Sequence, residues 1–430
     1  MPRTRNIPAR TLWSIPLLLL FLLGCSSQRK VHRFLGKQLQ YTDEGAQFTG
    51  FLMVDAHSGD TLYNRNAGKY FTPASNIKLF TFYAALKTLP ERIPALKYLV
   101  RSDTLHVLGT GDPTPLHPAL ADSTAISFMK GFSHVVLFPG NLKDPAWGPG
   151  WAWDDFDRYY MPQRSALPIH GNVLEVFRKG DSLEVVPDPF RDSVLVEKHP
   201  FRRQPEKNRF YYPPGRTDTV TIPLVLDSRL TRVLWETASG VPTSLGRKHP
   251  TGSWQVLPGF SADSLYREMM TVSDNFLAEQ TMLLVSATLG DTLSFERARD
   301  HILEAYLKEL PTPPRWVDGS GLSRYNLCSP ESLVYLLAEL YREVPEQRLF
   351  GLLAQGGGKG TLQEWYRDPG GPYLFGKTGS LSNNHNLSGY LKTKSGRTVV
   401  FSFMNNHYRK PTRLVKSRMQ RILNWVREHY

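Results

Sequence analysis

Cysteine is scarce in this sequence, because the 430 residues include only two, Cys25 and Cys328. So few cysteines exclude a small scaffold held together by disulfides, and no paired Cys-x-x-Cys motif is present to hold zinc. Hydrophobic residues make up 41% and charged residues 21% of the chain, which excludes a disordered tail and a polytopic membrane protein. The sequence also has no internal repeat. Its length predicts a globular protein of about two or three domains.

Motifs for nucleotides and metals are missing as well. The glycine-rich run 356–360 contains a lysine, but glycine follows that lysine and leucine occupies position 353, so the P-loop pattern fails. Gly109-Thr110-Gly111 lacks the third glycine of a dinucleotide-binding fingerprint. A His-Glu-x-x-His zinc motif does not occur either. We therefore expect neither a metal site nor a cofactor.

Acidic residues are outnumbered, 39 against 52 lysines and arginines, which gives a formal net charge of +13. Positive charge alone would fit a nucleic acid, a membrane surface or an acidic polymer as the partner. Part of this charge lies at the N-terminus, where residues 1–11 carry three arginines and no acid before the apolar run 12–23. That run is shorter than the roughly 20 apolar residues of a membrane-spanning helix, so it predicts an export signal.

The end of this run reads Leu-Leu-Gly-Cys, finishing at Cys25, and is similar to a lipobox. We expect residues 1–24 to be a lipoprotein signal peptide, Cys25 to carry the lipid and residues 25–32 to form a tether; an uncleaved anchor helix is the alternative. In either case the protein is exported and faces the periplasm or the cell wall. Export argues against a nucleic acid as partner and matches the remaining positive charge to an anionic wall or membrane. Cys328 then has no intramolecular partner, and we expect it to be a buried or incidental thiol.

Hydrophobic periodicity predicts several helices and strands. The expected strands are a hairpin over 50–64 and three antiparallel strands at 373–380, 387–393 and 398–405. The expected helices lie at 73–89, at 276–289, after Ser329-Pro330, and at the C-terminus, where Val415, Met419, Ile422 and Val426 share one face. The intervening residues 91–255 are rich in proline, glycine and aromatic residues and contain short strand-like runs.

Ser75 and Lys78 stand at the start of the helix predicted over 73–89. Residues three apart lie on the same face of a helix, and a helix N-terminus is positive and offers free N–H groups. Ser75 is therefore either a capping residue or a nucleophile whose developing oxyanion is stabilised there. The Ser-x-x-Lys pattern is weak by itself, because Ser27 with Lys30 and Ser127 with Lys130 also match it.

Two further motifs follow in order along the chain and strengthen the first. Ser273-Asp274-Asn275 directly precedes the helix predicted over 276–289. The run Lys-Thr-Gly-Ser at 377–380 lies on a predicted strand that is followed by two antiparallel partners. The three motifs together indicate acyl transfer by a nucleophilic serine.

With these motifs the sequence resembles the penicillin-recognising active-site serine enzymes, and among them the D-alanyl-D-alanine carboxypeptidase/endopeptidase family. The resemblance covers roughly residues 45–430, and segments 109–114, 150–155, 318–326 and 360–362 also carry it. It implies a serine transpeptidase/β-lactamase-like α/β fold, in which helices flank a five-stranded antiparallel sheet. That domain would be built from 33–90 and 256–430, and 91–255 would be a compact, mostly β insert. Thr110, where glycine is common, departs from the family pattern.

The resemblance implies a reaction and a role for each motif. The substrates would be peptidoglycan stem peptides ending in D-Ala-D-Ala, and β-lactam antibiotics would be covalent inhibitors. Ser75 would be the nucleophile and Lys78 its base, made neutral by burial and by the second cation, Lys377. Ser273 would relay a proton to the leaving amine, and Asn275 would orient Lys78 and hold the substrate amide.

Substrate binding is assigned in the same way. Lys377, Thr378 and Gly379 would bind the substrate, with the terminal carboxylate held by the first two. Ser380 would join them, and its backbone N–H would form the oxyanion hole with that of Ser75. In the insert, Asp154 and Asp155 would contact the free amine of a stem-peptide diamino acid, or else be solvated loop carboxylates.

Two other functions remain to be weighed against this one. A class A β-lactamase would need a deacylating glutamate in a Glu-x-x-Leu-Asn context, but the only Leu-Asn pair is preceded by Gln420 instead. A non-catalytic wall-binding or sensor protein would tolerate loss of Ser75 or Lys78, and both are intact. The sequence therefore favours an enzyme.

Overall fold

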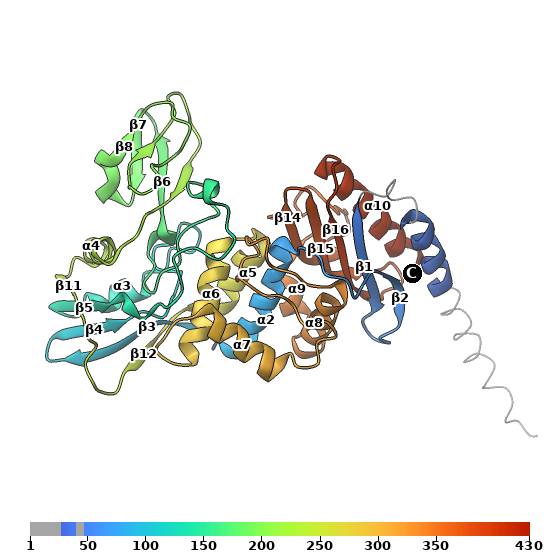
Figure 1. The fold of residues 1–430 in the computed structure, drawn as a ribbon, viewed down its shortest axis with the longest axis horizontal. Coiled ribbons are helices and arrows are strands. Elements are labelled where there is room, and N and C mark those ends of the chain that lie inside the picture. Colours follow the sequence, from blue (N-terminus) through green and yellow to red (C-terminus); the bar gives the residue numbers. More distant parts are fainter. Residues whose placement is uncertain (1–26, 40–46) are drawn as a thin grey trace, which may run out of the picture.

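The computed structural model describes residues 27–39 and 47–430 (Figure 1). The predicted signal peptide 1–24 and the predicted lipid-bearing Cys25 lie outside the described residues. Within the described ranges, no helix is long and apolar enough to cross a membrane.

The main sheet contains six strands, each antiparallel to its neighbours, in the order β13-β14-β15-β16-β1-β2. Their bounds are β13 Ala354–Gln355, β14 Leu374–Leu381, β15 Asn384–Lys392, β16 Thr398–Asn406, β1 Phe48–Asp55 and β2 Thr61–Arg65. The hairpin and the three C-terminal strands are confirmed, but the sheet has one strand more than the expected five. The additional strand is β13, whose two residues pair with the outer edge of β14 and are too few to show an alternating pattern.

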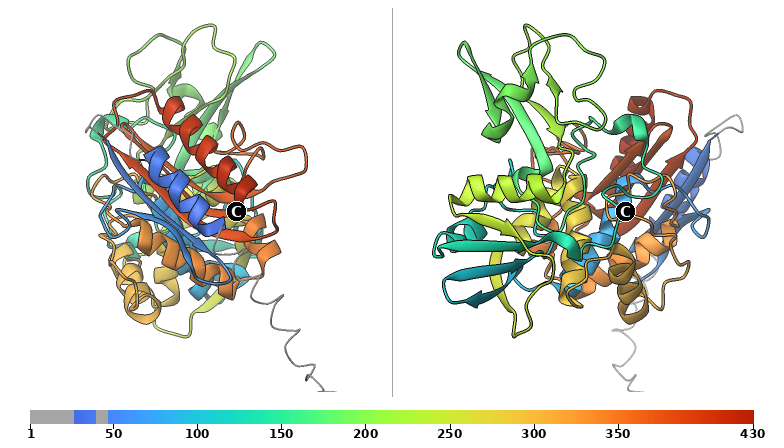
Figure 2. Two further views of the ribbon diagram at one scale, coloured as in Figure 1. Left: turned by 90° about the vertical axis from the view of Figure 1, so that its right-hand side faces the viewer. Right: turned by 60° about the vertical axis from the view of Figure 1, so that its left-hand side comes forward.

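One face of this sheet is covered by the helix over 27–39 and by α10 (Thr412–His429), which lie side by side in Figures 1 and 2. Val31 and Leu35 of the first helix are fully buried and belong to the same apolar cluster as the predicted inner face of α10, which confirms that face. Residues 27–32, expected to form a tether, are therefore ordered helix, because burial of Val31 holds this segment on the domain.

The other face carries a larger layer of helices (Figure 1). This layer contains α2 Lys78–Thr88, α5 Ala262–Thr271, α6 Asn275–Thr288, α7 Phe295–Tyr306, α8 Pro330–Glu343 and α9 Glu346–Gly351. The helices expected at 73–89, at 276–289 and after Ser329 are confirmed, and the Ser329 hydroxyl caps α8 by accepting from the Ser332 N–H. Cys328 is fully buried in the apolar core of this layer as a free thiol, as expected.

Residues between α2 and α5 build three smaller sheets at the far end of the molecule (Figure 1). A five-stranded sheet has the order β11 Thr243–Leu245, β5 His134–Phe138, β4 Thr104–Leu108, β3 Arg92–Arg101 and β12 Gln255–Ser261. Helices α3 (Thr124–Met129) and α4 (Ser228–Ser239) pack into the core of this region. Strand β12 reaches Ser261, beyond residue 255 where we expected the insert to end.

The remaining strands of this region form two small sheets. These are β10 Val220–Pro223, β6 Val173–Lys179 and β7 Ser182–Val186 in one, and β8 Val194–Leu195 with β9 Phe210–Tyr211 in the other. The loops that connect these sheets to the five-stranded sheet include residues 144–165, which lie against α6 and contribute to the candidate site.

Candidate active site

Ser75 lies in a 3-10 helix, Ala74–Ile77, that leads directly into α2. Lys78 is the first residue of α2, and its Nζ donates to the Ser75 Oγ at 3.0 Å. The Lys78 side chain is fully buried, whereas Ser75 is partly exposed. The predicted proximity of the two residues is therefore confirmed, in an arrangement where the lysine can take a proton from the serine.

The turn at Ser75 is held by two buried asparagines, Asn386 of β15 and Asn76 of the 3-10 helix itself. Ala74 has a φ of +48°, a left-handed conformation that a residue with a Cβ adopts only under constraint. Asn386 Nδ2 donates to the carbonyl oxygens of Thr72 and Pro73, both at 2.9 Å, and Asn76 Nδ2 donates to the Ser388 Oγ at 2.8 Å. We did not single out these asparagines from the sequence. The signal for Asn386 is the polar run 384–386 on a strand whose residues are all buried but the last.

Asn275 and Ser320 complete the surroundings of the Lys78 amine. Lys78 Nζ donates to Asn275 Oδ1 and to the Ser320 carbonyl oxygen, both at 2.6 Å. Asn275 starts α6, and its Nδ2 in turn donates to the Tyr160 carbonyl oxygen at 3.0 Å. The predicted orientation of Lys78 by Asn275 thus has a direct hydrogen bond, and Ser320 is an additional partner.

Ser273 stands in the turn that precedes α6, with a φ of +68°. Its neighbour Asp274 caps the helix by accepting from the Leu277 N–H at 2.8 Å. Within the described residues, the Ser273 hydroxyl forms no hydrogen bond with Ser75 or Lys78. Its part in proton transfer therefore stays a prediction.

Lys78 and Lys377 are both buried, and both have a lowered pKa. Burial lowers the pKa of Lys78 to about 8, against the opposing charges of Asp274, Asp318 and Glu279. Burial and the Lys78 charge lower the pKa of Lys377 well below its ordinary value. Repulsion between the two amines is mutual, so it disfavours the state in which both are charged, whereas the three carboxylates favour the charged form of Lys78.

Strand β14 brings the third motif against the nucleophile turn. Gly379 is required at this contact, since a Cβ there would lie 2.3 Å from the Pro73 carbonyl oxygen. Lys377 is fully buried and donates to the Thr378 carbonyl oxygen at 2.9 Å, and Thr378 is itself only 7% exposed. Strand β14 therefore packs through Gly379 on the turn that carries Ser75, and the role of its residues in substrate binding stays a prediction.

Ser380, the next residue of β14, is exposed, and its hydroxyl lies 2.8 Å from Nδ1 of His385 on the neighbouring strand. Burial lowers the pKa of His385 to about 3, so its ring is neutral at physiological pH. The neutral ring fixes the Ser380 side chain without adding a charge to the site. His385 was not among the residues that we singled out from the sequence.

The loop from Asp318 to Gly321 contacts both the Ser75 turn and Lys78. The buried Asp318 carboxylate accepts the N–H groups of Gly321 at 2.8 Å and Ser323 at 2.7 Å, which folds the loop around it. Gly321 has a φ of +82°, and a Cβ there would lie 2.0 Å from the Ala74 carbonyl oxygen. The loop is therefore packed directly on the turn that presents Ser75.

Replacing Gly321 with alanine is expected to lower the acylation rate by on the order of 100-fold, because the added methyl group displaces the Ser75 turn. The matched control is Gly396→Ala. Gly396 has a φ of +86° but no atom within 4 Å of the added carbon, so only backbone strain of about 1 kcal/mol is expected. Labelling rates with a fluorescent penicillin would compare the two variants. Equal rates would show that the contact with Ala74 does not matter.

Asp154 and Asp155 lie in a 3-10 helix, Trp153–Asp155, of the inserted region. Asp154 is exposed, and Asp155 Oδ1 accepts from the Tyr160 hydroxyl at 2.6 Å. Tyr160 also accepts from Asn275 through its carbonyl oxygen, so it connects Asp155 to the asparagine that contacts Lys78. The segment Trp153–Asp155 is therefore connected to Asn275 through Tyr160.

The described residues contain no group of three or more His, Cys, Asp or Glu side chains placed to hold a metal ion.

Comparison with known proteins places the chain in a family. A model of the D-Ala-D-Ala carboxypeptidase 3 (S13) family matches residues 35–186 and 248–427. The chain is 33% identical to Carboxypeptidase DacB of Mycolicibacterium smegmatis over 151 residues, which is 33% of each protein, so the match spans only a third of that relative. It is 26% identical to the D-alanyl-D-alanine carboxypeptidase of Actinomadura sp., covering 86% of this chain and 80% of that protein.

The same fold occurs in penicillin-binding protein 4 (dacB) from Haemophilus influenzae. Its crystal structure matches with a TM-score of 0.70 at 19% identity, covering 92% of this chain and 99% of the other. This likeness confirms the predicted fold class. The two segments that match the family model contain all three motifs. The chain therefore belongs to the D-Ala-D-Ala carboxypeptidase 3 (S13) family.

Proposed function

We propose that the protein is a serine-type D-Ala-D-Ala carboxypeptidase/endopeptidase that hydrolyses peptidoglycan stem peptides or their cross-links through an acyl-enzyme on Ser75. The observation that carries this proposal is the 3.0 Å contact between Lys78 Nζ and Ser75 Oγ, in a buried site that also contains Asn275 and Lys377. Membership of the S13 family and the names of the relatives support the same reaction.

Acylation begins when neutral Lys78 removes the proton from the Ser75 hydroxyl. The Ser75 oxygen then attacks the carbonyl carbon of the penultimate D-Ala residue and forms a tetrahedral oxyanion. Backbone N–H groups of Ser75 and Ser380 are the proposed donors to this oxyanion, and each such donor typically contributes about 3 kcal/mol. Lys377 and Thr378 hold the terminal carboxylate, whose negative charge stabilises a protonated Lys377.

The intermediate collapses when the carbon–nitrogen bond breaks. The proton that Lys78 accepted passes through Ser273 to the leaving amine, so that D-Ala departs neutral at nitrogen and the acyl group remains as an ester on Ser75. A water molecule then attacks the ester, its proton returns through Lys78 to Ser75, and the shortened peptide is released. Overall, one peptide bond and one water molecule are consumed.

The pH dependence of acylation follows from Lys78, whose burial lowers its pKa to about 8. Below this pKa the amine is protonated and cannot accept the Ser75 proton, so the rate should rise tenfold per pH unit and level off above it. At saturating penicillin the apparent pKa should lie at or below about 8, because the bound antibiotic keeps Lys377 charged. Stopped-flow acylation between pH 5.5 and 9.5 measures this profile. A rate that is constant across this range would contradict a lysine base.

Asp154 and Asp155 are proposed to contact the free amine of a diamino acid at the third position of the stem peptide. Support comes from the hydrogen bond between Asp155 and the hydroxyl group of Tyr160, whose carbonyl oxygen accepts from Asn275. Cleavage of peptides containing lysine or norleucine at this position would compare substrates with and without the amine. An unchanged preference in Asp154→Asn and Asp155→Asn would exclude the contact.

Penicillin is proposed to inhibit the enzyme by acylating Ser75, since its strained amide and carboxylate resemble the cleaved peptide. The penicillin-binding protein 4 of Haemophilus influenzae has also been crystallised in complex with a β-lactam, which supports this part of the proposal. The exported location and the lipid on Cys25 remain proposals as well. Radiolabelled palmitate should be incorporated into the wild-type protein and not into Cys25→Ser.

The hydrolytic activity is tested with two synthetic substrates, a stem pentapeptide ending in D-Ala-D-Ala and a cross-linked dimer of stem peptides. The proposal predicts release of free D-Ala from the pentapeptide, cleavage of the dimer, or both, each blocked by penicillin. A protein that releases no D-Ala, cleaves no cross-link and takes up no penicillin would be a non-catalytic wall-binding protein instead.

A further inference from the structure

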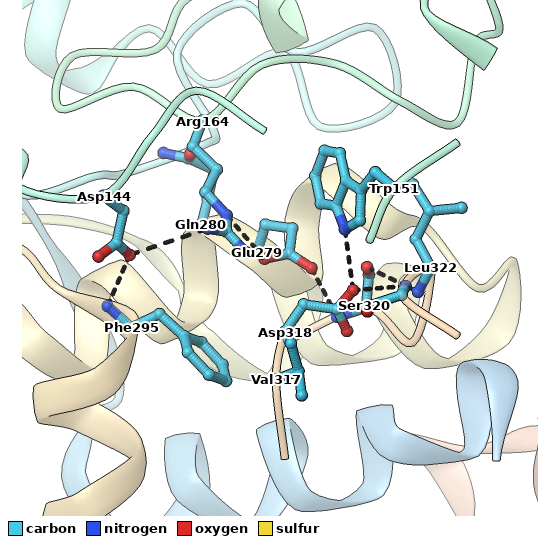
Figure 3. Close-up of polar contacts among 12 residues, drawn as sticks. Asp144, Trp151, Arg164, Glu279, Gln280, Phe295, Val317, Asp318, Ser320 and Leu322 are labelled. Carbon is cyan, nitrogen blue, oxygen red and sulfur yellow. Dashed lines mark hydrogen bonds and ion pairs between the residues drawn. The ribbon is translucent and has the colours of Figure 1, made fainter. Parts of the chain in front are cut away.

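A buried ion pair joins the inserted region to α6 beneath the active site (Figure 3). Arg164 donates through Nε at 2.9 Å and Nη2 at 2.6 Å to the same oxygen of Glu279, Oε2. The two side chains are only 3% and 2% exposed. Because both donors use Oε2, the second oxygen of Glu279 remains available to another partner.

That second oxygen leads to the catalytic base. Glu279 Oε1 accepts the Ser320 N–H at 2.8 Å, and the Ser320 carbonyl oxygen accepts from Lys78 Nζ at 2.6 Å. Glu279 follows Asn275 by one helical turn of α6. Asn275 accepts from the Lys78 amine directly, and Glu279 holds the residue whose carbonyl does so. The order of contacts is therefore Arg164, Glu279, Ser320 and Lys78.

The same segment of the insert contacts the site by other routes. Tyr160 accepts from Asn275, and the backbone of Ser165 both donates to and accepts from the Gln280 side chain. Trp151, over which the Arg164 guanidinium lies, donates through Nε1 to Asp318 Oδ2 at 2.9 Å (Figure 3). Residues 160–165 thus contact α6, and Trp151 contacts the 318–321 loop.

We propose that Arg164 and Glu279 are positioning residues for Lys78, and that through them the inserted region helps to position the catalytic base. Glu279 places the Ser320 carbonyl that holds the Lys78 amine, and the two hydrogen bonds from Arg164 orient the buried Glu279 side chain. This inference rests on the proposed function, because it assigns the residues that support the base of that reaction.

The charges around Lys78 make the proposal testable through pH. The lysine faces Asp274 and Glu279 from the α6 side, Asp318 from the loop, and Lys377 from β14. Arg164 pairs with Glu279, and its Nη1 also lies 3.9 Å from Oδ2 of Asp144. Replacing Glu279 with glutamine keeps the shape and the acceptor for Ser320. It removes one negative charge near Lys78 and leaves Asp144 as the remaining ion-pair partner of Arg164, so both effects favour neutral Lys78.

The experiment measures the acylation rate with penicillin as a function of pH for wild type, Glu279→Gln and Arg164→Lys. We expect the plateau rate of Glu279→Gln to fall by on the order of 10- to 100-fold, since the base is misplaced. We also expect its acidic limb to move to lower pH. Arg164→Lys should retain part of the rate, because a charge remains opposite Glu279, but it loses the forked geometry.

The matched control is Asp291→Asn, which breaks another ion pair between the insert and the catalytic layer. Asp291 follows α6 and pairs with Lys97 of β3 at 2.9 Å, and it is more than half exposed. This variant should acylate like wild type with the same pH profile. A structural role of Glu279 would lower the thermal unfolding temperature without moving the acidic limb in the protein that remains folded.

A second readout separates this inference from the proposed function. In protein with ¹³C-labelled lysine side chains, an NMR titration gives the pKa of Lys78, assigned by comparison with Lys78→Arg, and needs no activity. The pKa should fall in Glu279→Gln and stay unchanged in Asp291→Asn. An inactive wild type would overturn the proposed function alone, whereas unchanged Lys78 titration and unchanged rates in both Glu279→Gln and Arg164→Lys would overturn this inference.

Discussion

Ser75→Ala is expected to form no covalent adduct with penicillin and to lose D-Ala release by a factor on the order of 10⁴ or more. The reason is that Ser75 Oγ is the proposed site of the acyl group. Its hydrogen bond with Lys78 places the base that is proposed to remove its proton. The methyl group of alanine fills less space and leaves the buried Lys78 in place, so the variant should remain folded. Fluorescent penicillin labelling followed by gel electrophoresis, together with D-Ala release, measures both losses.

Ser127→Ala is the matched control, because Ser127 and Lys130 form a second Ser-x-x-Lys pair on the exposed side of α3. This variant should be labelled at the wild-type rate. Labelling of Ser75→Ala, or loss of labelling in Ser127→Ala, would show that the nucleophile has been wrongly assigned.

Lys78→Met is expected to lower the acylation rate by about 10²- to 10⁴-fold, the usual contribution of a positioned general base. Methionine has a similar length and is apolar, so it suits a position that is fully buried. It leaves the Asn275 and Ser320 oxygens without their donor, which costs about 1–3 kcal/mol for each buried group. Rapid-mixing kinetics with penicillin measures the rate, and circular dichroism on heating confirms that the variant is folded.

Two features of this variant separate a base from a purely structural lysine. The acidic limb near pH 8 should disappear in Lys78→Met, because the group that titrates there is absent. Lys130→Met, the exposed counterpart on α3, should change neither the rate nor the profile. If folded Lys78→Met keeps the wild-type pH profile, another group is the base.

The spatial arrangement of the proposed catalytic residues was largely predictable, because the proposed chemistry requires particular residues at fixed spacing. Ser75 and Lys78 are three residues apart on one helical turn, and Lys377 lies on a strand with clear antiparallel neighbours. The inner face of α10 was readable for a similar reason, since its apolar residues recur every three or four positions. Local periodicity is sufficient in these cases because each pattern is contained within one element.

The supporting residues were not predictable in this way. Arg164 and Glu279 are 115 residues apart, and neither belongs to a repeated pattern, so only the packing of the insert on α6 brings them together. Strand β13 is too short to show alternation, and the polar, mixed sequence of 26–46 left open whether a tether or a first helix would form there. These features depend on contacts between distant segments, which hydrophobic periodicity does not encode.

The measurement that tests the central claim most directly is the location of the penicillin adduct. The wild-type protein would be incubated with benzylpenicillin, digested with a protease and examined by tandem mass spectrometry. The acyl-enzyme mechanism predicts one penicilloyl group per chain, on Ser75. A stoichiometric adduct on any other residue, or D-Ala release by a protein that takes up no penicillin at all, would contradict it.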